Sequence, residues 1–130
     1  MRRRFFVLGV VLIALGGGAV HSGANGSVNE QAVIVNFDYG SSDWKPFFGF
    51  ESTLQQAISK SGTGEYDGNE LAANGSDGRM YMYGPDADKL FAVVKPLLLS
   101  THLLKNIRVT LRYGAVSDKG ARVVTLRLGS

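Results

Sequence analysis

Alternation of apolar and polar positions predicts the strands of this chain. Residues 32–39 (AVIVNFDY) place apolar and polar side chains on opposite faces, and residues 107–113 (IRVTLRY) repeat the pattern with the same period of two. Residues 64–71 form a shorter, irregular strand that Gly68 interrupts. Strands are expected at residues 32–39, 64–71, 79–83, 107–113 and 121–128.

Apolar positions at helical spacing predict two helices between these strands. The first begins between Pro46 and Phe50 and ends near Gly62, which follows a basic last turn. The second begins at residues 84–88, where a proline and early carboxylates favour a helix N-terminus. Pro96 is expected to kink this helix or to end its first segment.

The order of these elements predicts an α+β fold. The order is β-α-β-β-α-β with a C-terminal β extension, for which the ferredoxin-like two-layer sandwich is the economical solution. Two helices then cover one face of a sheet with strand order 4-1-3-2, and the other face stays open and polar. Alternation puts Met80 and Met82 towards the helices and Tyr81 on the open face.

The start of the chain has the three parts of a signal peptide. Arg2–Arg4 precede an apolar run, and small residues lead to Ser22–Ala24, so cleavage is expected before Asn25. We therefore divide the chain into a signal peptide, residues 1–24, and one domain, residues 25–130. An uncleaved anchor is the alternative, although the apolar run is shorter than the ~20 residues that span a bilayer. The general secretory route is favoured over twin-arginine export.

This leader predicts a periplasmic or secreted protein without stable membrane insertion once the leader is removed. The chain contains no cysteine, so disulfides, thiolate metal sites and a cysteine nucleophile are excluded. The remaining 106 residues are enough for one apolar core.

Removal of the leader changes the charge of the protein. Three of the 14 basic residues lie in it, which leaves 11 basic against 11 acidic residues, so no nucleic-acid partner is expected. The charges are segregated: residues 25–88 hold ten acidic residues, and residues 89–130 hold eight basic residues. The two halves either neutralise each other in the fold or form a dipolar surface that steers a charged partner.

The best enzyme hypothesis rests on carboxylates near residues 64–71. Glu65, Asp67 and Glu70 could divide acid and base roles in a small cell-envelope hydrolase. No cofactor and no metal site are expected, because His102 is the one histidine after the leader and no phosphate-binding loop occurs.

A non-enzymatic binding role is the favoured prediction. Tyrosine and arginine are enriched at the energetic centres of protein interfaces, and the open sheet face collects both. The expected partner is a protein, bound by an inhibitor, an immunity-type protein or an accessory subunit; a homodimer or a self-assembling structural subunit is the alternative. The predicted partner-binding residues are Asp38, Glu65, Asp67, Arg79, Tyr81, Tyr83, Arg108 and Arg112.

Three sequence patterns also resemble other proteins. The segments GEYDGNE, YGPDADKLF and LRYG look like those of a group of small bacterial proteins with no established activity. The resemblance covers about residues 32–114 and implies no site residues.

Overall fold

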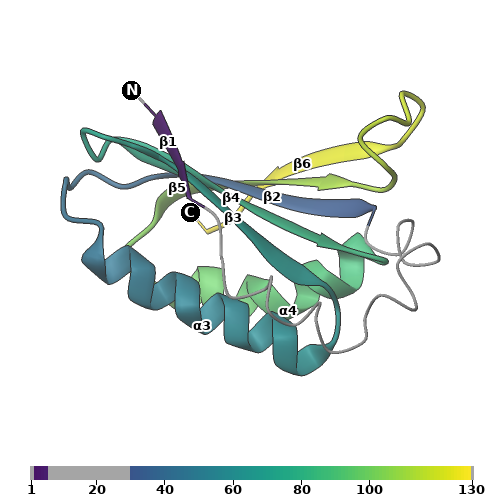
Figure 1. Ribbon diagram of the computed structural model, residues 1–130, viewed down its shortest axis with the longest axis horizontal. Helices are drawn as coiled ribbons and strands as arrows, with labels where there is room; N and C mark the ends of the chain where they lie inside the picture. Colours follow the sequence, from purple (N-terminus) through teal and green to yellow (C-terminus); the bar gives the residue numbers. More distant parts are fainter. Residues whose placement is uncertain (1, 6–29, 130) are drawn as a thin grey trace.

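The computed structural model describes residues 2–5 and 30–129 and has two layers. One layer is a six-stranded antiparallel sheet, and the other consists of two helices that lie side by side on one of its faces (Figure 1). The predicted α+β class is therefore confirmed. No helix of the described residues covers the opposite face of the sheet.

The strands pair in an order that differs from their order in the chain. Across the sheet the order is β1-β3-β4-β2-β5-β6, and all neighbours are antiparallel. The bounds of the strands are β1 Arg2–Phe5, β2 Gln31–Asp38, β3 Glu65–Ala72, β4 Asp77–Gly84, β5 Lys105–Arg112 and β6 Val123–Arg127.

The predicted βαββαβ order does not match the element order of the whole chain. Two strands come first, because Arg2–Phe5 form β1 at the edge of the sheet before β2 begins. The pairing of β1 joins residues far apart in sequence, with Arg4 opposite Glu70. Local periodicity cannot reveal such a contact. The rest of the predicted leader, including the cleavage site before Asn25, lies outside the described residues.

Both helices begin and end where local chemistry favours it. Helix α3 (Lys45–Ser61) has Pro46 in its first turn and ends at Gly62, whose φ of 69° is the left-handed conformation that glycine adopts readily. Helix α4 (Ala87–Ser100) is capped by Asp86, whose carboxylate accepts hydrogen bonds from two backbone amides of the first turn. Pro96 does not end α4, which continues to Ser100.

The core lies between the helices and the inner face of the sheet. Met80 and Met82 are fully buried, which confirms the predicted register of β4. An aromatic cluster closes one end of the core: the rings of Phe37 and Phe47 stack at 5.3 Å, and those of Tyr39 and Trp44 stack at 4.1 Å. Because inner positions alternate with outer ones, this core determines which side chains the opposite face presents.

Candidate functional site

Strand register arranges most outer side chains of the sheet in three rows, and Asp38 lies beyond the second row, two residues after Asn36. We call this surface the open face. The middle row contains Tyr81, Ile34, Thr110 and Thr125. The second row contains Glu70, Arg79, Asn36, Arg108 and Arg127. The third row contains Glu65, Tyr83, Ala32, Arg112 and Val123. A middle row without charged residues thus lies between two rows that contain them.

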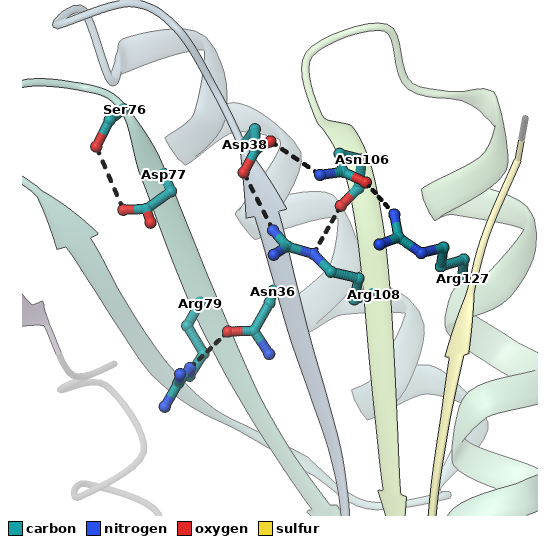
Figure 2. A network of polar contacts seen from close by, with 8 residues as sticks. All are labelled: Asn36, Asp38, Ser76, Asp77, Arg79, Asn106, Arg108 and Arg127. Atoms are coloured by element: carbon teal, nitrogen blue, oxygen red, sulfur yellow. Dashed lines mark hydrogen bonds and ion pairs between the residues drawn. The ribbon is translucent and has the colours of Figure 1, made fainter.

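A polar network joins β2, β5 and β6 through two arginines of the second row and the adjacent Asp38 and Asn106 (Figure 2). Arg108 donates to Asp38 at 3.1 Å and to the backbone carbonyl of Asn106 at 2.9 Å. The side-chain amide of Asn106 donates to Asp38 at 3.0 Å, and its carbonyl oxygen accepts from Arg127 at 2.6 Å. The Asp38 side chain is half exposed, so its ion pair contributes about 0–1 kcal/mol to stability. The network mainly orients the two guanidinium groups.

Asn106 holds this network in an unusual backbone conformation. Its φ is 52°, a left-handed value that asparagine tolerates better than most residues. The pairing of β2 with β5 shifts register beside it, between Asn36 and Asp38. The irregularity turns the Asn106 side chain to a place where it reaches both Asp38 and Arg127.

At the β3 end of the second row, a tyrosine links Arg79 to Glu70. Arg79 donates to Asn36 at 2.7 Å and to the hydroxyl of Tyr81 at 3.4 Å. The Tyr81 hydroxyl in turn donates to the carboxylate of Glu70. Tyr81 therefore lies between a guanidinium and a carboxylate that occupy neighbouring strands.

Arg112 is positioned by backbone carbonyls in the third row. Its guanidinium donates to the carbonyl oxygens of Gly114 at 2.7 Å and Glu30 at 3.1 Å. The same group lies 6.0 Å from the ring centre of Tyr83, within the range of a cation–π contact. These contacts hold Arg112 across β2 from Tyr83.

Most of the predicted partner-binding residues come together on this face. The register places seven of them there: Asp38, Glu65, Arg79, Tyr81, Tyr83, Arg108 and Arg112. Asp67 differs, because it lies at a bulge where the pairing shifts between Tyr66 and Gly68. Beyond this bulge Glu70, not Asp67, continues the open face. The predicted set did not include Asn36, Asn106 and Arg127. Alternation within residues 32–39 and 121–128 places Asn36 and Arg127 on this face, whereas the position of Asn106 depends on the register shift beside it.

The carboxylates of the hydrolase hypothesis are spread along β3. Glu65 and Glu70 lie two rows apart, which corresponds to about 13 Å along a strand. Carboxylate pairs that cleave glycosides lie about 5–9.5 Å apart. The described clefts are lined by other residues: one along α3 has a volume of about 790 Å³, one at the α4–β5 connection about 330 Å³, and one beside the start of α3 about 390 Å³.

A buried polar cluster lies on the opposite, helix-facing side of β3. Tyr66 and the amide of Asn69 both donate to the carboxylate of Glu51 on α3, and Tyr66 and Asn69 are almost fully buried. Burial, reinforced by the nearby Glu51 carboxylate, raises the pKa of Tyr66 far above its usual value. Sequence reasoning missed this cluster because the bulge turns Asn69 inward.

Comparison with known proteins finds no family model, curated protein or solved structure that matches the chain. Within residues 2–5 and 30–129, no helix is long and apolar enough to cross a membrane. The same residues contain no group of three or more histidine, cysteine, aspartate or glutamate side chains that could hold a metal ion.

Proposed function

We propose that this chain is an exported, non-enzymatic protein that recognises a protein partner through its open face. The observation that carries the proposal is the gathering of two tyrosines and four arginines on one sheet surface that no described helix covers: Tyr81, Tyr83, Arg79, Arg108, Arg112 and Arg127. Such residues dominate the binding energy of protein interfaces. Inhibitor, immunity-type and accessory-subunit roles all fit this surface.

Preorganisation of these side chains supports a binding role. Arg108 and Arg112 each hold two hydrogen bonds within the chain, so part of their conformational freedom is already lost before any partner arrives. A partner then loses less affinity to the ordering of side chains. The guanidinium of arginine has five N–H donors, so each group keeps donors for a partner.

We also propose that residues 31–112 form a ferredoxin-like unit to which β6 is added, and that cleavage before Asn25 removes β1 from the exported protein. The support for this is the run β2-α3-β3-β4-α4-β5, in which the strands lie in the order β3-β4-β2-β5. This arrangement leaves the open face available, because both connections that contain a helix cross the other face.

Export to the periplasm or beyond remains part of the proposal and rests on the predicted leader, residues 1–24. N-terminal sequencing of the protein from the cell envelope and from the medium tests it. A product that begins near Asn25 supports export, and an intact Met1 in the cytosol contradicts it.

Partner capture with interface variants tests the binding role. Tyr81→Ala removes an aromatic side chain and Arg112→Glu reverses a charge on the open face, whereas Lys60→Glu reverses a charge at the end of α3 as the matched control. Proteins captured by cross-linking are identified, purified and titrated against each variant. We expect each open-face variant to weaken a specific complex by about 30-fold, the effect of losing one hot spot, while Lys60→Glu leaves affinity unchanged.

Two outcomes separate the rival functions. Turnover of a cell-envelope substrate that Glu65→Gln abolishes, without any specific partner, contradicts the binding role and supports the hydrolase. Association of the protein with itself that Tyr81→Ala abolishes supports the self-assembling subunit instead.

A further inference from the structure

On the open face the acidic residues of β3 and the basic residues of β5 and β6 lie towards opposite edges of the sheet, although Arg79 of β4 lies opposite Glu70. The acidic outer residues Glu65 and Glu70 lie on β3, towards one edge of the sheet. Arg108, Arg112 and Arg127 lie on β5 and β6, at the other edge. We call these three arginines the basic side. Strand β2, from the acidic half of the sequence, brings Asp38 next to Arg108, whereas Arg112 lies opposite the uncharged Ala32 and Arg127 lies on β6, which does not pair with β2.

The acceptors that hold two of these arginines carry no charge. Arg127 donates to the amide oxygen of Asn106, and Arg112 donates to backbone carbonyls of Gly114 and Glu30. A neutral acceptor orients a guanidinium without cancelling its positive charge. Arg112 and Arg127 are therefore oriented but not neutralised by these contacts, whereas Arg108 is paired with Asp38.

The register also sets two like charges against each other. Arg108 and Arg127 are direct cross-strand partners on the open face, an arrangement that is unfavourable in an isolated sheet. Figure 2 shows their guanidinium groups on either side of Asn106. The Asp38 carboxylate offsets part of the charge of Arg108, and a further carboxylate above the two guanidinium groups reduces the remaining repulsion, so the arrangement favours an anionic ligand.

We propose that the basic side binds a carboxylate-rich segment of the protein partner. This proposal rests on the proposed function and specifies the chemistry of the segment that the open face recognises. Carboxylates match the planar donor edge of arginine, which can bind them through two parallel hydrogen bonds. A protein segment suits this face better than a nucleic acid does, because Glu65 and Glu70 repel a polyanion that extends over the whole sheet. An acidic segment above β5 and β6, continued by neutral or basic residues above β3, complements both sides.

The test uses the protein as it accumulates in its cell, with the N-terminus recorded by mass spectrometry. A short polyglutamate peptide is titrated into isotope-labelled protein at low ionic strength, and amide chemical shifts map its position. Arg127→Gln removes one charge but keeps an N–H donor for Asn106, and Lys60→Gln removes one charge at the end of α3 as the control. A short oligothymidylate serves as the nucleic-acid probe.

We expect shifts centred on β5 and β6, affinity about fivefold weaker in Arg127→Gln, and no change in Lys60→Gln. Because Arg108 and Arg127 repel each other in the ligand-free state, the melting temperature of Arg127→Gln should equal or exceed that of the parent protein. If Arg127 only stabilised the fold, the substitution would lower the melting temperature instead. Each of four results overturns the assignment: no binding of the peptide, shifts centred on the helices, an equal loss of peptide affinity in both variants, or tighter binding of oligothymidylate than of the peptide. If Tyr81→Ala weakens the binding of a captured partner and Arg127→Gln does not, only this inference is overturned. If neither substitution changes the affinity for that partner, the proposed function is overturned.

Discussion

Replacement of Tyr66 by phenylalanine should reveal the buried polar cluster through an unusual dependence of stability on pH. Tyr66 is 3% exposed, and its hydroxyl donates to the carboxylate of Glu51. A hydrogen bond to a charged group contributes about 1.5–3 kcal/mol, so Tyr66→Phe should lower the free energy of unfolding by about 2 kcal/mol at pH 7.

The pH dependence follows from the raised pKa of Tyr66. The folded chain retains this hydroxyl proton to a higher pH than the unfolded chain, in which tyrosine ionises near pH 10. The stabilisation is therefore fully present below about pH 10 and is lost as the pH rises above it, by about 1.4 kcal/mol per pH unit. Phenylalanine has no such proton, so the stability curves of the two proteins should cross near pH ~11.5.

Urea unfolding at a series of pH values measures both curves. The difference between parent and Tyr66→Phe cancels the titration of groups common to both proteins, and the absence of cysteine removes disulfide exchange at high pH as a complication. Tyrosinate absorbance should show one tyrosine that ionises only when the chain unfolds. Glu51→Gln should shrink the pH dependence without abolishing it, because burial is the larger cause of the raised pKa. A stability difference that stays constant from neutral pH to pH ~11.5 would refute the reasoning.

Three further substitutions test the core, a turn and a cap. Met80→Ala should lower the free energy of unfolding by about 2–5 kcal/mol in urea titrations, because this side chain is fully buried. A loss smaller than the one that Ile→Val typically causes in a protein core would show that Met80 is not part of the core. Gly75→Ala should lower the melting temperature far more than Gly62→Ala: both glycines have positive φ, but an added Cβ at Gly75 would lie 2.0 Å from a backbone oxygen, whereas Gly62 has open space. Asp86→Ala should lower stability by about 1 kcal/mol in thermal unfolding and Asp86→Asn by much less, since asparagine also caps helices; equal losses would argue against capping.

The sequence alone was sufficient to predict the α+β class and the inner face of most strands. Burial of Val33, Val35 and Phe37 follows from alternation in β2, and burial of Met80 and Met82 follows from the same pattern in β4. The ends of α3 near Pro46 and Gly62 also follow from local chemistry. These features depend on neighbours in the chain, which is why a sequence can specify them.

The tertiary structure decided the features that depend on contacts between distant segments. The pairing of β1 with β3 could not be read from either strand. The bulge at Asp67 reversed the faces of the later residues of β3, so that Glu70 faces outward and Asn69 faces the helices and donates a hydrogen bond to Glu51. A one-residue shift reverses every side chain beyond it, because strand faces alternate with a period of two.

The candidate site shows the same division. Alternation located its tyrosines and most of its arginines, because side-chain direction within a strand is a local property. The uncharged acceptor of Arg127 and the position of Asp38 beside Arg108 arose only when β2, β5 and β6 came together in one sheet. Net charge is a property of the sequence, but the pairing of strands determines which of those charges remain uncompensated on one face.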